Sequence, residues 1–399
     1  MKVIVIGGGA AGFFTAINIA EKHPDWQITI VEKTNKLLSK VKISGGGRCN
    51  VTNGRTAASE LVPFYPRGGK KLYGLFQEFG TAEMRKWLSK RGVNTHEEAD
   101  HRVFPATNDS QTIIDCFLQQ VRKHSITIKT NFSVLSLRQT EESWIVRSSS
   151  ETLQADKLII ATGSSPVAWK TLQQTGLEIV EPVPSLFTFN IKDARIKDLM
   201  GIAFGNVSVK IVGTKLDETG PLLITHWGLS GPAILKLSAW GARELSTKNY
   251  HFQILINYTG DQSADQVRSN LNDLKSSNPK RKLSNHPMYD IPKRFWERLL
   301  EYCEIGSDLP AGELSKKQIN KLVEELTQGL YDVKGKSTFK EEFVTSGGVK
   351  LSEVDLKTFE AKRFKNLYLA GEVLDIDALT GGFNFQACWS AGWIISQNI

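Results

Sequence analysis

Two glycine-rich segments at opposite ends of the chain predict an α/β protein with a Rossmann-like domain. The apolar stretch Lys2–Ile6 runs directly into GGGAAG at 7–12, and the apolar stretch Leu367–Ala370 runs into Gly371 and then Gly381-Gly382. Strand, glycine turn and helix, in that order, are the parts of a parallel sheet that binds a nucleotide. We therefore expect one domain built from both chain ends, with a second region inserted between them.

The first 32 residues are expected to form a βαβ unit. Residues 10–22 place Phe13 and Ile17 on one helical face, and Pro24 follows the end of that helix. Residues 27–32 then form a second strand, paired in parallel with the first through a right-handed crossover. The domain is expected to continue with a polar glycine-rich loop at 40–53, helices at 74–91 and 110–124, and strands at 126–129, 134–139, 144–148 and 157–161.

The character of the sequence changes after Pro182-Val183-Pro184. Alternating apolar residues over 186–258 predict strands, and 260–331 is mostly helical and polar. A strand is expected at 367–370 and a last helix at 385–395. We therefore expect a discontinuous nucleotide-binding domain at 1–188 and 340–399. The inserted substrate domain is expected at 189–339, β-rich and barrel-like over 189–260 and helical over 261–339.

The composition is that of a globular protein with more than one core, since the chain has 399 residues, 40% hydrophobic and 23% charged. It has no run of 18 apolar residues and no signal-peptide pattern, so we expect a cytoplasmic protein without a membrane partner. Four cysteines without a CxxC pair and seven histidines without an HxxxH pattern predict no metal site. The net charge of +8 includes Lys280-Arg281-Lys282 and Lys316-Lys317. We interpret these runs as solvated helical faces and do not expect nucleic acid as a partner.

Gly7, Gly9 and Gly12 satisfy the GxGxxG pattern, and each has a physical task. Gly7 permits a tight turn, Gly9 lets a pyrophosphate approach the backbone, and Gly12 lets the helix pack closely on the strand. The helix amino terminus adds free N–H groups and the positive end of its dipole. Glu32 lies 20 residues after Gly12, at the end of the second strand, where it can accept ribose hydroxyls. These residues fit FAD and NAD equally well.

The C-terminal segment distinguishes between FAD and NAD as the predicted cofactor. Ala370-Gly371-Glu372 follows an apolar strand, and Gly382 opens the last helix. The N–H groups of that helix would face an electron-rich acceptor such as a flavin ring. Because the chain has no second GxGxxG, we expect one extended FAD held by both chain ends. Any NAD(P)H would bind transiently, without a fingerprint of its own.

Two further loops carry candidate chemistry. SGGGRCNVTN at 44–53 has three consecutive glycines where backbone can lie close to a ligand, and Arg48 or Lys42 is expected near phosphate or substrate. Cys49 is interpreted as a packing residue. In THWGLSGPA at 225–233, His226 is a candidate acid or base, with a structural role as the alternative. His226 and Arg48 are therefore the candidate catalytic residues.

The motifs together resemble the YhiN/BaiN-like (HI0933-type) bacterial NAD(P)/FAD-dependent oxidoreductases, a family that includes aminoacetone oxidase-like flavoproteins. The resemblance rests on GGGAAG at 7–12, SGGGRCNVTN at 44–53, RVFP at 102–105, THWGLSGPAIL at 225–235, TSGGV at 345–349 and AGEVLDIDALTGGFNFQACWSAG at 370–392. It implies a two-part FAD domain with an inserted β-rich and helical region. Members are linked to bile-acid precursor reduction and to aminoacetone oxidation, so the resemblance implies FAD but no single substrate.

The resemblance also implies which residues contact FAD. These cofactor-binding candidates are Gly7, Gly9, Ala11, Gly12, Glu32, Lys33, Lys40, Arg48, Cys49, Asn50, Val134, Thr162, Gly163, Gly371, Glu372, Asp375, Gly382, Phe383 and Asn384.

We expect an FAD-dependent oxidoreductase that transfers a hydride between flavin N5 and a small organic substrate, with NAD(P)H or oxygen serving the other half-reaction. Three alternatives stay open. One is an aminoacetone oxidase-like amine oxidase that releases hydrogen peroxide. Another is a noncatalytic flavin-binding or RNA-associated protein, and the third is a flavin-dependent nucleic-acid modifier. The sequence predicts neither the substrate nor the oligomeric state.

Overall fold

The computed structural model describes residues 1–337 and 344–399. These residues form two compact units: unit 1, made of 1–183 with 344–399, and unit 2, made of 184–337. The division after residue 183 lies inside β11 (Ile179–Ser185), a strand that continues through both prolines of this region. The boundary expected between 339 and 340 lies outside the described residues.

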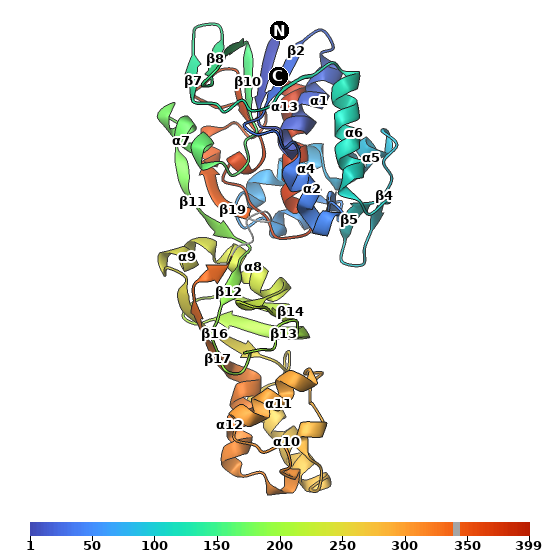
Figure 1. Ribbon diagram of the computed structural model, residues 1–399, viewed down its shortest axis with the longest axis vertical. Helices are drawn as coiled ribbons and strands as arrows, with labels where there is room; N and C mark the ends of the chain where they lie inside the picture. The colour runs from blue at the N-terminus through green and yellow to red at the C-terminus, as the bar shows by residue number, and fades with distance from the viewer. Residues whose placement is uncertain (338–343) are drawn as a thin grey trace. The chain divides into compact units, whose positions relative to one another are not determined.

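Unit 1 contains a five-stranded parallel sheet to which both ends of the chain contribute (Figure 1). The strand order is β20 (Leu367–Leu369), β10 (Lys157–Ile160), β1 (Lys2–Ile6), β2 (Gln27–Val31) and β6 (Thr127–Lys129), and each neighbouring pair is parallel. Val5, Ile30 and Ile159 are fully buried, which is typical of a parallel sheet covered on both faces. The predicted α/β, Rossmann-like fold is confirmed.

Helices α1 (Ala10–Lys22) and α13 (Phe383–Asn398) pack side by side in this unit (Figure 1). Gly392 makes their close approach possible, since a Cβ there would lie 2.6 Å from Thr15 Oγ1. Most of α13 is apolar and buried, including Trp389, as expected of a helix inside a domain. The first and last long helices of the chain thus share one core.

The other elements of unit 1 surround this sheet and helix pair. They are α2 (Ser39–Ile43), β3 (Thr52–Asn53), α3 (Ala58–Leu61), α4 (Tyr73–Glu78), α5 (Thr81–Ser89), β4 (Thr95–Glu97), β5 (Arg102–Pro105), α6 (Ser110–Lys123), β7 (Ser136–Gln139), β8 (Trp144–Arg147), β9 (Thr152–Ala155), α7 (Pro166–Gln174) and β19 (Val344–Val349), with 3-10 turns at Ser44–Gly47, Val62–Phe64 and Gly69–Leu72.

Two segments of unit 1 differ from expectation. The helix predicted over 74–91 is divided into α4 and α5 at Gly80, where a Cβ would lie 2.8 Å from the carbonyl oxygen of Phe76. The loop predicted over 40–53 contains the end of α2 and a 3-10 turn. Both differences arise at short turns. A turn of a few residues is too short to produce a recognisable apolar period in the sequence.

Unit 2 contains a seven-stranded antiparallel sheet. The strand order is β17 (Gly329–Lys334), β16 (His251–Asn257), β13 (Ala203–Ile211), β14 (Asp217–Ile224), β15 (Gly228–Ser230), β12 (Thr188–Asn190) and β18 (Lys336–Ser337). The two edge strands are joined by Gly335, whose N–H donates to the Tyr250 carbonyl and whose carbonyl accepts from Asn190 N–H. Because two residues span at most about 7 Å, the sheet edges meet there and the sheet curls into a barrel-like form.

The described part of unit 2 adds helices α8 (Pro232–Trp240), α9 (Ala242–Thr247), α10 (Ala264–Ser277), α11 (Lys293–Tyr302) and α12 (Lys316–Gln328). Helices α8 and α9 lie within the segment expected to be β-rich. The turn and proline of Ser230-Gly231-Pro232 predict the start of α8, which begins at Pro232, whereas the six residues of α9 are too few to show a helical period. Conversely, β17 lies in the segment expected to be helical. Its burial alternates residue by residue, with Tyr331 and Val333 inside, which is the pattern of a strand.

Each unit has a hydrophobic core of its own. The core of unit 1 gathers residues from its sheet, α1, α6 and α13, whereas that of unit 2 gathers residues from its sheet and from α8, α10, α11 and α12. Across the residues that the structure describes, no helix is long and apolar enough to cross a membrane.

Candidate functional site

The turn between β1 and α1 is built so that only glycine fits at two of its positions. Gly7 has a φ of +118°, and a Cβ there would lie 2.3 Å from the Ala161 carbonyl oxygen at the end of β10. A Cβ at Gly12 would lie 1.9 Å from the carbonyl oxygen of Gly7. Around Gly9, by contrast, no atom of the described residues comes within 4 Å of a Cβ position. The turn therefore packs tightly at its two ends and leaves open space at Gly9.

Helix α1 begins at this open space with its backbone donors free. Its N-cap is Gly9, no side chain in the described part of the chain caps it, and its first turn has no acidic residue. The first N–H groups of a helix have no partner within the helix. With the positive end of the dipole they form a site for an anion such as a pyrophosphate.

Glu32 lies at the end of β2 beside the glycine turn. One carboxylate oxygen accepts the Gly8 N–H at 2.9 Å, and the other accepts the Thr34 N–H at 3.1 Å. The carboxylate is thus held against the turn, next to α1, where a ribose bound along the turn would meet it. Lys33, the next residue, is exposed to solvent.

The C-terminal segment meets this turn directly. A Cβ at Gly371 would lie 3.1 Å from the Ala11 Cβ of α1, so the backbone after β20 approaches α1 closely. The neighbouring Glu372 accepts a hydrogen bond from Lys40 Nζ at 2.5 Å, and its other oxygen accepts the Thr345 N–H at 3.2 Å. Lys40 also reaches Ser164 Oγ at 3.3 Å. The site candidates Lys40 and Glu372, 332 residues apart, therefore form one ion pair.

Three buried hydroxyls close to this ion pair point to a ligand. Thr162 Oγ1, Thr345 Oγ1 and Ser346 Oγ have no hydrogen-bond partner among the described residues. Thr162 adjoins Gly7, since its amide nitrogen lies 3.0 Å from a Cβ position there, and Thr345 contacts Glu372 through its backbone. Buried polar groups are nearly always paired in native proteins. Unpaired hydroxyls beside an open glycine turn fit a polar cofactor that supplies the missing partners.

Thr345 and Ser346 are candidate site residues that sequence reasoning missed. They lie on β19 and precede Gly347 and Gly348, both with positive φ. Cβ atoms at these glycines would lie 2.7 Å from Pro182 Cα and 2.5 Å from the Val373 carbonyl oxygen. The available signal is the pair of small hydroxyl residues before two glycines in the TSGGV motif.

In the loop at 44–53, the predicted residues have partners within unit 1. The Arg48 guanidinium lies 3.9 Å from the centre of the Phe104 ring and 2.7 Å from a Glu98 carboxylate oxygen. Burial raises the pKa of the Cys49 thiol to about 12, against a smaller lowering by a hydrogen bond with Ser44. The thiol is therefore neutral at physiological pH and packs in the core, whereas Arg48 is held by a ring and a carboxylate.

The N-terminus of α13 is tied to that loop. Gly382 has a φ of +85°, and a Cβ there would lie 2.3 Å from the Thr52 carbonyl oxygen. With the Asn50 side-chain amide turned so that both of its neighbours are satisfied, its oxygen accepts the Gly382 N–H at 2.9 Å and its nitrogen donates to the Thr52 carbonyl at 3.0 Å. Asn384 bonds both the N–H and the carbonyl of Ala378, each at 3.0 Å. Asn50, Gly382 and Asn384 are thus brought together, and they shape the start of the helix.

Phe383 is the first residue of α13 and lies in the core. Its ring stacks on Phe64 at 4.3 Å between centroids, and its carbonyl accepts a hydrogen bond from the Tyr65 hydroxyl at 2.7 Å. Asp375 is half-buried beside this segment, and its N–H donates to the Val349 carbonyl. Both residues therefore connect the C-terminal segment to its neighbours in unit 1.

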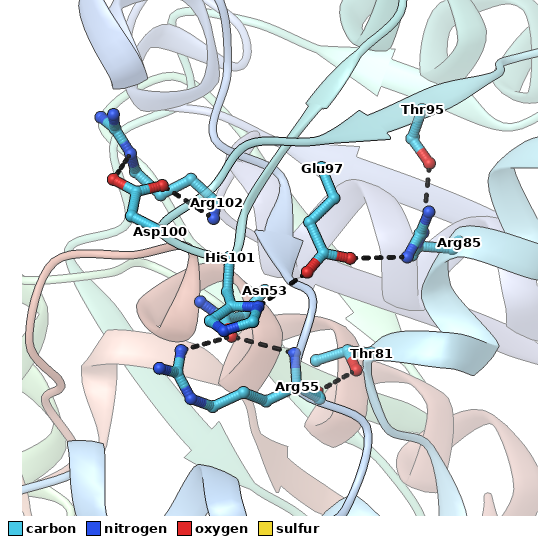
Figure 2. A network of polar contacts seen from close by, with 9 residues as sticks. All are labelled: Asn53, Arg55, Thr81, Arg85, Thr95, Glu97, Asp100, His101 and Arg102. Atoms are coloured by element: carbon cyan, nitrogen blue, oxygen red, sulfur yellow. Dashed lines mark hydrogen bonds and ion pairs between the residues drawn. The ribbon is translucent and has the colours of Figure 1, made fainter.

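A polar network holds the segment that follows the loop (Figure 2). The Asn53 side-chain nitrogen donates to the Gly381 carbonyl at 2.9 Å, and its Oδ1 accepts from the backbone N–H and the guanidinium of Arg55 at 3.1 and 3.2 Å. On the β4–β5 hairpin, Glu97 pairs with Arg85 and with His101. The hairpin therefore supplies carboxylates to nearby cations, whereas Arg55 bonds a neutral amide.

Three further candidates have simple surroundings. Val134 precedes β7 and is half-buried against the core of unit 1. Gly163 follows β10 with a φ of +60°. His226 is exposed on the turn between β14 and β15 of unit 2, where its ring meets Trp227 edge to face at 5.3 Å. The cofactor-binding candidates therefore all lie in unit 1, and the catalytic candidate His226 lies in unit 2.

The parallel sheet of unit 1, whose first strand leads into the glycine turn and α1, is a dinucleotide-binding fold. With the relatives given below, it places the chain in the class of FAD-dependent oxidoreductases. The particular family follows from a family model described as HI0933-like protein Rossmann domain, which matches residues 1–398. The chain belongs to this family, and the family prediction made from its motifs is confirmed.

Named relatives cover nearly all of the chain. A ribosomal RNA dihydrouridine synthase from Escherichia coli K12 is 29% identical over 408 residues, which span 99% of this chain and 97% of the relative. A 3-dehydro-bile acid delta(4,6)-reductase from Clostridium scindens is 25% identical over 99% of this chain and 98% of the relative. Among solved structures, a 3-ketosteroid-delta4-(5alpha)-dehydrogenase from Rhodococcus jostii has a TM-score of 0.51 at 13% identity, covering 99% of this chain and 97% of that one. At 13% identity, the similarity to the Rhodococcus structure shows a shared fold only.

Proposed function

We propose that this protein is a reductase that uses FAD to saturate a carbon–carbon double bond conjugated to a carbonyl group. The observation that carries the proposal is the chemistry shared by two full-length relatives. One is named for making dihydrouridine in ribosomal RNA, and the other for reducing a 3-dehydro bile acid. Both reactions add a hydride and a proton across a double bond that a carbonyl polarises.

The residues of unit 1 fit the cofactor that this reaction needs. We propose that the open turn at Gly9 and the N-terminus of α1 hold the pyrophosphate, and that Glu32 holds the adenosine ribose. The unpaired hydroxyls of Thr162, Thr345 and Ser346 would take up polar groups of the same ligand. When bound, FAD supplies a hydride donor at N5 that NAD(P)H has reduced.

The chain's own groups would then orient the reaction. The N-terminus of α13 presents a positive dipole end, which stabilises negative charge on an electron-rich ring. The Lys40–Glu372 pair joins the β20 end to α2 and holds the two glycine segments in one place. We keep His226 as the proposed proton donor and Arg48 as a proposed contact to cofactor or substrate.

Uridine in RNA is the first candidate substrate, and a 3-oxo steroid with a conjugated double bond is the second. The first follows from the E. coli relative and agrees with the net charge of +8. The second follows from the C. scindens relative and retains the expectation of a small organic substrate. The expectation that nucleic acid is no partner has no support from relatives named for ribosomal RNA.

The test is anaerobic stopped-flow spectroscopy of the purified protein with FAD. NADH or NADPH should bleach the flavin absorbance, and a uridine-rich RNA oligonucleotide should restore it with a mass gain of two hydrogen atoms per uridine reduced. Restoration by 4-androstene-3,17-dione instead would select the steroid candidate. Reduction by amines with peroxide release in air would overturn the proposal in favour of an amine oxidase, and protein that binds no flavin would overturn it outright.

The same assay addresses the proposed proton donor. In His226→Asn, restoration of the flavin by substrate should be slowed, because the proposed donor protonates the substrate as the hydride is transferred to it, while bleaching by NAD(P)H, which involves no substrate, should be unchanged. Two unchanged half-reactions would assign His226 a structural role.

A further inference from the structure

The charge of the chain is concentrated in one segment of unit 1. Residues 33–77 contain nine Lys or Arg and a single acidic residue, Glu60, for a net charge of +8. The whole chain also has a net charge of +8, so the charges of its remaining residues sum to zero. Such a concentration creates a local positive potential that attracts polyanions.

Some of these cations are neutralised within unit 1. Lys40 pairs with Glu372, Arg48 with Glu98, and Arg67 with Asp377. Arg55, Lys70 and Lys71 form no ion pair with any acidic residue that the structure describes. Lys70 and Lys71 are exposed, and Arg55 is half-exposed. These three cations are therefore available to a partner.

The same three residues lie beside the loop that leads into α13. Lys70 and Lys71 follow Arg67 and Gly68, and these two hold the segment against the loop. Arg67 pairs with Asp377, and a Cβ at Gly68 would lie 3.4 Å from Ile376. The two lysines therefore follow, within three or four residues, a segment that is held against residues 376 and 377.

Arg55 approaches the same loop from another direction. Its guanidinium lies 4.8 Å from the centre of the Phe64 ring, which stacks on Phe383 at the start of α13. Figure 2 shows Arg55 against Asn53, whereas Arg85 and Arg102 face Glu97 and Asp100. Acidic residues of the hairpin therefore neutralise Arg85 and Arg102, whereas no acidic residue in the described part of the chain pairs with Arg55.

An aromatic side chain accompanies the two lysines. Tyr73 is the first residue of α4, two positions after Lys71, and its side chain is 42% exposed. A base can stack on an exposed aromatic ring whatever its identity, and neighbouring cations hold the backbone phosphates. Cations interleaved with an exposed ring match single-stranded nucleic acid better than a small carboxylate.

We propose that Arg55, Lys70, Lys71 and Tyr73 form a contact surface for the phosphodiester backbone and one base of a single-stranded RNA. The inference rests on the proposed function, because it assigns the place where an RNA substrate is held beside the α13 end of the cofactor site. Phosphate contacts position the nucleic acid, and this surface carries no base-edge recognition.

The test measures binding of a fluorescein-labelled, uridine-rich, single-stranded RNA to the FAD-loaded protein over a series of salt concentrations. Lys70→Glu/Lys71→Glu should weaken binding at low salt by roughly tenfold or more, and should lower the slope of log K against log salt by about one to two, one for each lost phosphate contact. Tyr73→Ala should weaken binding roughly tenfold with the slope unchanged.

The matched control is Lys316→Glu/Lys317→Glu, an exposed lysine pair at the start of α12 with no acidic partner in the described chain. It should bind RNA like the wild type, and each variant must retain the flavin-to-protein ratio of the wild type. If both double variants lose the same amount of RNA affinity, the proposed surface is wrong. It is also wrong if anionic lipid vesicles bind through Lys70 and Lys71 and RNA does not bind.

The proposed surface and the proposed function can fail separately. If RNA binds as proposed but no double bond is reduced, the surface stands and the proposed function fails. If the steroid is reduced and RNA does not bind, the proposed function stands and the surface fails.

Discussion

Two glycines of the first turn have opposite physical reasons to be glycine. At Gly12 the reason is internal, because a Cβ would collide with the backbone carbonyl of Gly7 at 1.9 Å. At Gly9 the backbone is extended, with φ −97° and ψ −168°, and any residue can adopt it. The space around Gly9 is open among the described residues, so nothing in the fold there requires glycine, and we propose that it serves an incoming group.

These two glycines can therefore be separated by experiment. Gly12→Ala should lower the stability of the apoprotein by about 1–3 kcal/mol, because backbone atoms must move to admit the methyl group. Gly9→Ala should leave that stability nearly unchanged and weaken FAD binding, because the methyl group occupies the approach to the turn. Thermal unfolding of the apoproteins and fluorescence titration with FAD measure the two effects. Equal losses of stability would contradict this division.

At the scale of elements, α13 is held by a buried polar network. The Gln386 side chain accepts from Thr52 Oγ1 at 2.6 Å and donates to the Phe79 carbonyl at 3.1 Å and to Ser390 Oγ at 2.9 Å. Gln386 is fully buried. One side chain thus connects the helix to β3 and to the end of α4, and so determines where the α13 N-terminus lies.

Removing that side chain should displace the helix. In Gln386→Leu the Thr52 hydroxyl loses its acceptor, and an unpaired buried group costs about 1–3 kcal/mol. We expect a loss of that size in the free energy of unfolding by urea, together with weaker FAD binding. Gln397→Leu, an exposed position on the same helix, is the control and should change neither quantity. A neutral Gln386→Leu would show that the network does not hold α13.

At the scale of the whole molecule, the two units have separate hydrophobic cores and differ in the polar groups that they contain. Every cofactor-binding candidate lies in unit 1. Unit 2 contains a buried ion cluster in which Arg195, 3% exposed, pairs with Asp193 and Glu325. Burial alone would raise the pKa of Asp193, but the hydrogen bonds from Arg195 outweigh it and hold that pKa below its usual value. Asp193 therefore stabilises unit 2 above its unfolded pKa, and this contribution is lost as the pH falls through the lowered pKa.

Two separate cores predict two unfolding transitions in scanning calorimetry. A ligand that binds one native unit raises the transition of that unit by mass action, so FAD should raise only one of the two transition temperatures. Arg195→Met should lower the other, at a cost of about 1–3 kcal/mol in stability, because the partly buried carboxylates of Asp193 and Glu325 lose the partner that they share. A single transition that both changes move together would contradict independent units.

Sequence reasoning succeeded where a local pattern decides the structure. The strands β1, β2, β10 and β20 and the helices α1, α6 and α13 follow from apolar periodicity and glycine turns. It identified the start of α8 at Pro232, but it failed at α9, whose six residues are too few to show a helical period, and at β17, whose alternation directly follows the helical pattern of α12. The partner of Arg48 could not be predicted, because Glu98 comes from a hairpin whose approach depends on tertiary packing.

By itself the sequence determined the two glycine turns, the strand and helix around each of them, and the family that they identify, because backbone sterics and apolar periodicity act between near neighbours. Only the tertiary structure decided which distant groups meet. The parallel order sets β20 beside β10, which has β1 on its other side. This arrangement places Glu372 on Lys40 and leaves the hydroxyls of Thr162 and Thr345 without partners among the described residues. It also decided that acidic residues neutralise some cations of 33–77 and not Lys70 or Lys71, because an ion pair depends on distance in space rather than separation along the chain.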